Sequence, residues 1–360
     1  MPDALKETIN GLFNPTIFVC VGTILFFLAI IFYRVWTKPV AALAIAIVFT
    51  SGLLISMTDK NFFIIVSKPD NVPIIGLIYL VGFFTWLSLR QAAINDERLE
   101  KGLPPREAEE TNDRVLVWPD LVYIELISMI ILTVVLIIWS IELKAPLEDP
   151  ANPAATPNPS KAPWYFLGLQ EMLVYFDPWI AGVVLPSLII SGLIIIPFVD
   201  KNPKGVGYYT LKERPFAITT YLFGFIVLWV LLIIMGTFFR GPNWNFFGPY
   251  EYWDVHKAPS LANVDLSEYF WVKWLGIARP ANILLRELPG FVLVIGYFLV
   301  LPPLLAGTVF KKIYKQIGFM RYNLLIMHLI VMLSMIIKMV ARWGFNLKYV
   351  VSIPEYFFNI

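Results

Sequence analysis

Residues 119–142 read PDLVYIELISMIILTVVLIIWSIE, and this stretch decides the fold class of the chain. It begins at a proline, and between Glu125 and Glu142 it contains no charged side chain. A helix needs about 20 mostly apolar residues to cross the hydrocarbon core of a bilayer. The stretch therefore predicts a membrane-spanning helix. Pro119 suits its first turn, because the N–H that proline lacks would be unpaired there.

The composition of the whole chain agrees with a membrane protein. Of its 360 residues, 58% are hydrophobic and only 15% are charged, whereas a soluble domain carries about 25% charged residues. The net charge of +2 argues against a nucleic-acid partner. Cys20 is the only cysteine, so the chain can form neither an internal disulfide nor a thiolate cluster. We expect a polytopic membrane protein without a metal site of its own.

Outward from residues 119–142, the same kind of apolar stretch recurs on both sides. Eight candidate spans follow from this pattern, at Pro15–Trp36, Pro39–Met57, Pro73–Leu89, Pro119–Glu142, Pro178–Val199, Pro215–Phe239, Pro289–Phe310 and Leu324–Val340. The predicted fold class is all-α, a polytopic membrane bundle of about eight transmembrane helices. With an even number of spans, both termini lie on the same side.

The connections between the spans indicate an orientation. Four short basic connections fall on one side, and they contain residues 34–38, 90–114, 201–214 and 311–321. The positive-inside rule places these connections in the cytoplasm. The long connection from Arg240 to Leu288 lies on the other side and is rich in aromatic residues, which favour the headgroup level. It predicts an ordered aromatic cap on the outer face.

A second outer connection, residues 153–172, reads PAATPNPSKAPWYFLGLQEM. A proline-rich loop ends there, and a short, nearly apolar helix begins, between two membrane-length stretches. Aromatic bulk and fixed-φ prolines at this place predict a pocket for an amphipathic ring molecule at the bilayer edge. Glu171 is the only acid on this helix. It either extends to water or faces the pocket, where a partly buried carboxylate could accept a proton from a bound hydroxyl.

Two further acids and two histidines could carry chemistry. Asp120 and Glu125 lie near the cytoplasmic start of the fourth span and could line a cavity there. Asp120 is also explained by the helix dipole, which favours an acid in the first turn. His256 lies in the cap and His328 lies within the last span, so we do not expect the two to meet. The chain alone should therefore not ligate a bis-histidine haem, and any redox centre should lie in partner chains.

From Trp118 onward, the chain resembles the C-terminal half of cytochrome b, which is a separate subunit IV in bf-type complexes. The matching landmarks occur in the family's order, and they are WPDLVYI at 118–124, DPANPAATP at 149–157, APWYF at 162–166, PF at 197–198 and RPF at 214–216. The segment from residue 342 to residue 360 is similar to the ending of an extended bacterial form of this family.

The resemblance implies a quinol oxidation site on the outer face, formed by Pro163, Trp164, Tyr165 and Phe166. Pro163 stands where the family has the glutamate of its Pro-Glu-Trp-Tyr motif. Variants without that glutamate go with low-potential menaquinol, so menaquinol is the expected substrate. Glu171 then becomes the candidate for the missing catalytic carboxylate.

The resemblance also implies a quinone-reducing site on the cytoplasmic face, near Asp120 and Glu125. Haem b would be held by a separate N-terminal cytochrome b subunit, and a Rieske-type iron–sulfur or cytochrome c subunit would accept electrons. We expect a multisubunit complex, for which a dimer is one form, in a bacterial cytoplasmic membrane.

Three domains follow from the resemblance, and two functions other than a quinol-oxidising subunit remain open. Residues 1–117 hold spans of unknown role, residues 118–239 are the subunit IV-like module, and residues 240–360 hold the cap and two further spans. The chain could instead be a structural anchor of such a complex with a degenerate quinol site. It could also be a transporter, although no inverted repeat is visible.

Overall fold

The computed structural model describes residues 2–110, 116–143, 145, 147, 150–204, 207–258 and 263–360. Asp149, the first residue of the loop motif quoted above, lies outside the described residues. The helical elements, with η for short turns of tighter or wider helix, are α1 (Asp3–Leu12), α2 (Pro15–Ile31), α3 (Tyr33–Trp36), α4 (Pro39–Ser56), α5 (Lys60–Val66), α6 (Val72–Glu100), α7 (Arg106–Glu110), η1 (Val117–Leu121), α8 (Val122–Glu142), η2 (Trp164–Phe166), α9 (Leu167–Met172), η3 (Ile180–Val184), α10 (Leu185–Val199), α11 (Pro215–Leu222), η4 (Phe223–Val230), α12 (Leu231–Ile234), η5 (Met235–Phe239), η6 (Pro242–Trp244), α13 (Leu266–Glu268), η7 (Tyr269–Trp274), α14 (Ile283–Arg286), α15 (Leu288–Leu299), α16 (Leu301–Gly307), α17 (Lys311–Phe345) and η8 (Pro354–Tyr356). Two short antiparallel strands, β1 (Ser352–Ile353) and β2 (Phe358–Asn359), lie near the C-terminus.

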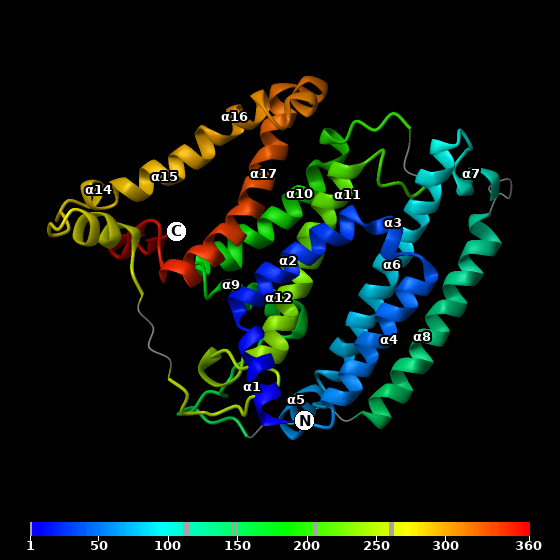
Figure 1. Cartoon of the computed structure of the whole chain (residues 1–360), viewed down its shortest axis with the longest axis horizontal. Helices are drawn as coiled ribbons and strands as arrows, with labels where there is room; N and C mark the ends of the chain where they lie inside the picture. The colour runs from blue at the N-terminus through cyan, green and yellow to red at the C-terminus, as the bar shows by residue number, and fades with distance from the viewer. Residues whose placement is uncertain are drawn as a thin grey trace.

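The fold is an α-helical membrane bundle, which confirms the predicted fold class (Figure 1). Within the described ranges, seven helices are long and apolar enough to cross a bilayer. An eighth span results if α1 and α2, which meet at an angle of 69°, are taken as one broken span. The multi-pass membrane location follows directly from these helices.

Two helices extend well beyond the membrane spans predicted from the sequence. The third span was predicted to end at Leu89, but α6 continues to Glu100, where that carboxylate accepts hydrogen bonds from Arg34. The last span was predicted to begin at Leu324, but α17 begins at Lys311 and is kinked at Gly318, whose φ is 78°. Hydropathy marks where a helix leaves the hydrocarbon, whereas the helix itself continues wherever its polar end finds partners.

The helix from Pro215 to Phe239 lies at the centre of the bundle and is called the central helix below. In its most apolar window 56% of the residues are buried, against 0% for the window in Val117–Glu142. The main core packs residues of α2, α6, α9 and α17 around it. That core therefore takes side chains from all three predicted domains, whose boundaries stay a prediction.

Small residues bring α9 close to the central helix. A Cβ atom added at Gly236 would lie 3.2 Å from the carbonyl oxygen of Leu167. A Cβ atom added at Gly168 would lie 3.2 Å from a ring carbon of Trp229. Such small-residue contacts let two backbones approach within a membrane. They fix the position of the short helix that follows the proline-rich loop.

The aromatic segment from Arg240 to Leu288 is ordered in its described parts. Its first half packs on the N-terminal helices, where Tyr250 shares a hydrogen bond of 2.7 Å with the Ser56 hydroxyl. Its second half pairs with the C-terminal tail, where Leu266 N donates to the Tyr349 carbonyl at 2.9 Å. We keep the name cap for this segment; its place on the outer face stays a prediction.

The two ends of the bundle differ in the elements that they carry. In Figure 1, α3, α7 and α16 lie at the upper end, whereas α1 and α5 lie at the lower end with the N-terminus. The described parts of the four basic connections gather at the upper end, called the basic end below. The lower end carries the first half of the cap and is called the cap end.

Helix α8 stands apart at the edge of the bundle (Figure 1). None of the residues in its apolar window is buried, and both Trp118 in the preceding η1 and Ile141 near its end are 68% exposed. A helix with an apolar surface on all sides is suited to lipid or to the helices of another subunit.

Candidate functional site

The turn at Pro163 is built by local hydrogen bonds at the cap end. Pro163 is extended, with φ −51° and ψ 146°, and its carbonyl accepts from Phe166 N at 2.8 Å. The side-chain amide of Gln170 donates to the Ser160 carbonyl and accepts from Ala162 N, both at 2.8 Å. Gln170 therefore ties the proline-rich loop to the first turns of α9, and this holds the aromatic residues between them.

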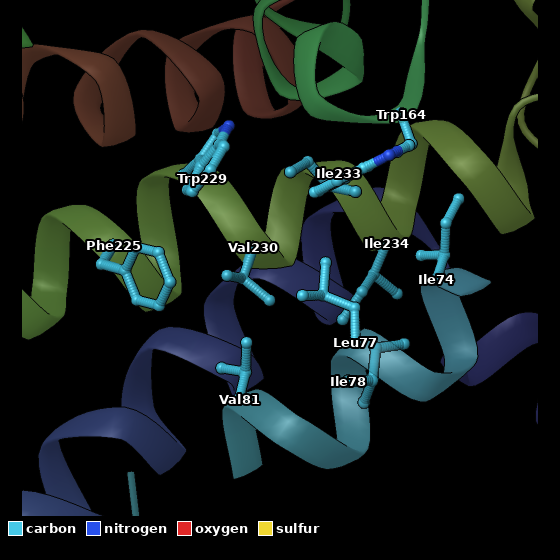
Figure 2. Close-up of a pocket in the computed structure, with 10 residues that line it drawn as sticks. All are labelled: Ile74, Leu77, Ile78, Val81, Trp164, Phe225, Trp229, Val230, Ile233 and Ile234. Atoms are coloured by element: carbon cyan, nitrogen blue, oxygen red, sulfur yellow. The ribbon is translucent and has the colours of Figure 1, made fainter. Parts of the chain in front are cut away.

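A small apolar cavity lies beside this turn, between α6 and the central helix. Figure 2 shows its lining residues, which are Ile74, Leu77, Ile78, Val81, Trp164, Phe225, Trp229, Val230, Ile233 and Ile234. Its volume is about 40 Å³. A protein cavity of roughly 150 Å³ holds benzene, so a quinol ring enters only if side chains move. Trp164, which is 36% exposed, is placed at the rim where such movement is easiest.

Of the four predicted quinol-site residues, the structure brings Trp164 to this cavity. Tyr165 and Phe166 do not line it, and they are 45% and 50% exposed. The backbone of Tyr165 nevertheless contacts a residue of the cavity wall, because its carbonyl accepts from Trp229 Nε1 at 3.2 Å. Pro163 acts through the backbone, since it sets the entry to the turn.

Glu171 is fully buried, with an exposed fraction of 0%. Arg240 donates to it twice, from Nε to Oε2 at 2.8 Å and from Nη2 to Oε1 at 2.6 Å. The Tyr175 hydroxyl donates to Oε1 at 2.9 Å, and Trp244 Nε1 donates to Oε2 at 3.2 Å. The sequence predicted that Glu171 either extends to water or faces a pocket. In the structure, Glu171 is the centre of a buried ion pair.

This donor set limits what Glu171 can do. A carboxylate offers about four lone-pair sites, and four donors occupy them here. Burial alone would lower the pKa of Arg240, but the Glu171 carboxylate outweighs it and the pKa of Arg240 is raised. Burial and the same carboxylate raise the pKa of the Tyr175 phenol well above its usual value. A quinol hydroxyl reaches Glu171 only after a donor has left, so the proton-accepting role of Glu171 stays a prediction.

A second hollow, of about 340 Å³, lies beside the end of α9. It is lined by Asn158, Pro159, Ser160, Gln170, Leu173, Val174, Asn243 and Trp244. Asn243 and Trp244 both have φ of 57°, a conformation that bulky residues rarely adopt. Two hydrogen bonds between Asn158 and Asn243, at 2.9 and 2.6 Å, help to hold this backbone.

Lys161 is the residue that the sequence reasoning missed. Its Nζ donates to the Thr237 carbonyl at 2.7 Å and lies 4.8 Å from the centre of the Trp253 ring. Burial and the nearby Lys68 lower the pKa of Lys161 to about 7, although Asp70 opposes the shift. One signal was available in the sequence, because Lys161 is the only charged residue between Pro150 and Gln170.

Asp120 and Glu125 are not brought into a common cavity by this chain. Both lie on the isolated helix η1–α8, and neither lines the two cavities described above. Asp120 Oδ2 accepts from Leu116 N at 3.4 Å, which is a first-turn contact. Five residues of helix turn through about 140° beyond one full turn, so the two acids point to different sides. A site that uses both needs walls from a partner.

Neither histidine lines the two cavities described above. The ring of His328 joins Ser191 Oγ through Nε2 at 2.8 Å and the Leu324 carbonyl through Nδ1 at 2.7 Å. It therefore links α17 to α10, and both ring nitrogens are engaged. Among the described residues, no three His, Cys, Asp or Glu side chains are grouped so that they could hold a metal ion.

Fold and site together define a polytopic α-helical membrane protein with an apolar cavity that has Trp164 at its rim, beside the turn at Pro163. The family described as "Cytochrome b(C-terminal)/b6/petD" matches residues 150–250. The matched segment contains the turn at Pro163, Lys161 and the Glu171–Arg240 pair, and it confirms the resemblance for this part of the chain. No solved structure matches the chain.

The family match supports a membrane subunit of a bc- or b6f-type complex that takes part in electron transfer. Complexes of this family contain quinone, haem b and partner subunits.

Proposed function

We propose that the chain is a membrane subunit of a bc-type quinol:cytochrome c oxidoreductase and forms part of its quinol oxidation site. The observation that carries the proposal is the cavity between α6 and the central helix, with Trp164 at its rim. It lies partly within the segment that matches the cytochrome b C-terminal family. An apolar cavity with one aromatic residue at its edge suits a ring that arrives from the hydrocarbon.

In this proposal the cavity binds and orients the ring, and the partners carry the redox centres. Oxidation of a quinol releases two protons and two electrons, and the aliphatic walls around Ile74 and Ile233 can accept neither. Haem b in an N-terminal cytochrome b subunit, and an iron–sulfur cluster or haem c in another subunit, would take the electrons. This chain contributes shape, exclusion of water and a proton path.

The substrate that we propose is menaquinol, and the membrane is the bacterial cytoplasmic membrane. Support for menaquinol comes from Pro163, which stands in place of the family's glutamate. Support for the orientation comes from the four basic connections at one end of the bundle, which the positive-inside rule places in the cytoplasm. The cavity beside Trp164 then opens toward the outer face.

A second, quinone-reducing site is proposed at the basic end, near Asp120 and Glu125. Glu125 lies on the exposed surface of α8, and a carboxylate inside a membrane span is a functional candidate. Because the window in Val117–Glu142 has no buried residue, helices of the haem-binding subunit would have to supply the remaining walls. Glu125→Gln in the assembled complex should slow quinone reduction there, while quinol oxidation at the cap end continues.

The proposal is tested by purifying the complex in mild detergent through a tag on this chain. We expect b-type haem to copurify, visible in the reduced-minus-oxidised spectrum, and a soluble naphthoquinol to reduce it. A preparation that is otherwise intact but lacks haem would refute the oxidoreductase assignment. Faster reduction by a ubiquinol analogue of matched potential would refute menaquinol as the substrate but leave the complex assignment standing.

A pair of tryptophan variants separates an active site from a mere anchor. Trp164→Ala removes the aromatic rim of the cavity, whereas Trp274→Ala removes an exposed ring of the cap that is 69% accessible. An aromatic contact contributes about 0.5–1.5 kcal/mol beyond its buried area, so Trp164→Ala should lower kcat/KM by up to about tenfold. If both variants keep full turnover with normal haem content, the structural-anchor alternative gains support.

A further inference from the structure

Lys161 lies just beyond the outer end of the cavity described above. The carbonyl that accepts its hydrogen bond belongs to Thr237, three residues after Ile234 in the central helix. Thr237 belongs to η5 and so lies further along the central helix than Ile234, its last lining residue. Along the chain, Lys161 comes three residues before Trp164. The ammonium group therefore sits where the apolar cavity meets the cap.

Buried polar atoms without a partner gather around Lys161. Among the described residues, four buried side-chain polar atoms make no hydrogen bond, and two of them are Thr237 Oγ1 and Trp253 Nε1. Both residues are direct neighbours of the Lys161 ammonium. Thr237 is only 1% exposed. Buried polar groups normally have a partner, so this cluster points to a ligand that brings an oxygen.

The electrostatic surroundings allow Lys161 to change its charge near neutral pH. From the turn between α5 and α6, Lys68 and Asp70 act on it. Thr237 on η5 and Trp253 in the cap, which contact it, carry no charge. The acid that could have fixed its charge, Glu171, is already held by Arg240. Burial is the main reason that the pKa of Lys161 falls to about 7.

We infer that Lys161 is the proton acceptor of the quinol oxidation site. In this inference, Lys161 contacts the quinol oxygen at the outer end of the cavity. The inference rests on the function proposed above. In the neutral form, Lys161 Nζ takes the proton from the quinol O–H, and the O–H bond breaks as the N–H bond forms. The electron leaves the quinol for a one-electron acceptor in a partner, an iron–sulfur cluster or a haem. The ammonium then releases the proton to water at the cap end.

The inference is tested with the pH dependence of quinol oxidation by the purified complex. In the parent protein, kcat/KM should rise with pH through about 7, because only the neutral amine of Lys161 accepts a proton. Lys161→Met should lower kcat about 100-fold at pH 8, as expected for loss of a general base. It should also abolish the rise of kcat/KM with pH, which is called the pH-dependent limb below. Lys161→Arg should behave alike, because a guanidinium does not lose its proton in proteins.

Two variants outside the cavity keep the test independent of folding. Lys68→Met removes a like charge and should raise the pKa of Lys161, which moves the limb to higher pH. Asp70→Asn removes an opposite charge and should move the limb to lower pH. A purely structural lysine cannot produce two shifts of opposite sign.

The outcomes separate the two proposals. If the intact parent complex, with its haem present, oxidises no quinol, the proposed function fails. If the parent complex is active but Lys161→Met keeps both the rate and the pH-dependent limb, the role of Lys161 fails while the function stands. Unchanged limbs in both Lys68→Met and Asp70→Asn would also overturn the role of Lys161.

Discussion

Arg240 holds Glu171 in a two-pronged ion pair, with Nε–Oε2 and Nη2–Oε1 distances of 2.8 and 2.6 Å. The side chains are 8% and 0% exposed, so the pair lies in the core. It joins α9, which follows the proline-rich loop, to the end of the central helix. The position of the turn at Pro163 therefore depends on this pair.

Breaking the pair should destabilise the complex strongly. Removal of one member of a buried ion pair leaves the other charge unpaired and costs about 3–5 kcal/mol. Glu171→Gln and Arg240→Gln should each show this loss in thermal or denaturant unfolding, and the double variant should lose less than their sum. Arg98→Gln is the matched control, because its partner Glu109 is 52% exposed and such a pair contributes at most about 1 kcal/mol. Strictly additive losses would show that the two residues act independently.

Glu171→Gln should also keep the pH-dependent limb of quinol oxidation. All four lone-pair sites of the carboxylate are engaged by protein donors, so loss of its charge should affect stability and not the proton transfer itself. The measurement is the pH profile of kcat/KM at a temperature where the variant is folded. Loss of the limb in Glu171→Gln, but not in Lys161→Met, would restore Glu171 as the proton acceptor.

Filling the cavity should weaken quinol binding. Leu77 lines the cavity from α6, whereas Leu80 on the same helix is 56% exposed to the outside. Leu77→Trp places an indole in a space of about 40 Å³ and should raise KM for the quinol at least about tenfold. Leu80→Trp should leave KM unchanged. An equal KM in both variants would mean that the ring binds elsewhere, and the larger hollow beside Trp244 would be the next place to examine.

A single methyl group on the central helix should displace α9. At Gly236 it would meet the Leu167 carbonyl oxygen at 3.2 Å, closer than most Cβ contacts, and backbone gives way only with difficulty. Gly236→Ala should therefore lower both stability and turnover. At Gly82 in α6 an added Cβ would meet nothing within 4 Å beyond its own helix backbone, so Gly82→Ala should gain up to about 1 kcal/mol from its higher helix propensity. If Gly236→Ala were stabilised by as much, the close packing of α9 against the central helix would not be needed for stability.

Hydropathy predicted the spans well because each span must satisfy its backbone by itself in lipid. Their ends were less predictable, since the continuation of α6 to Glu100 depends on Arg34, which lies 66 residues away in the chain. The isolation of α8 was also invisible in the sequence. Its composition equals that of a buried helix, and only the packing of the other helices leaves it outside.

The turn at Pro163 was predictable from the sequence, but the contacts of its charged residues were not. The proline-rich turn and Trp164 were found from local pattern, because proline and aromatic residues signal the turn directly. The role of Glu171 depends on Arg240, which is 69 residues distant, and no local pattern predicts such a pair. Lys161 was overlooked because lysine in a loop normally points to water, whereas here it is partly buried against Trp253 of the cap.

Acid should release the first helix, α1, from the cap end. Lys6 pairs with Asp59 at 2.7 Å, and Asp59 also caps α5 by accepting from Asn61 N and Phe62 N. Burial alone would raise the pKa of Asp59, but Lys6 and the two N–H groups together lower it below the usual 3.8. A carboxyl with a lowered pKa stabilises the folded form above its unfolded pKa, and this contribution is lost as the pH falls through the folded value.

Amide hydrogen exchange of α1, corrected for the intrinsic rate at each pH, measures this release. Protection should be constant from pH 7 to about 4 and fall below that. Asp59→Asn keeps a good cap for α5 but cannot pair with Lys6, so protection of α1 should already be low at pH 7 and vary little with pH. If Asp59→Asn protected α1 as well as the parent protein at pH 7, the docking of α1 would rest on the contact between Asn10 and Tyr250 instead.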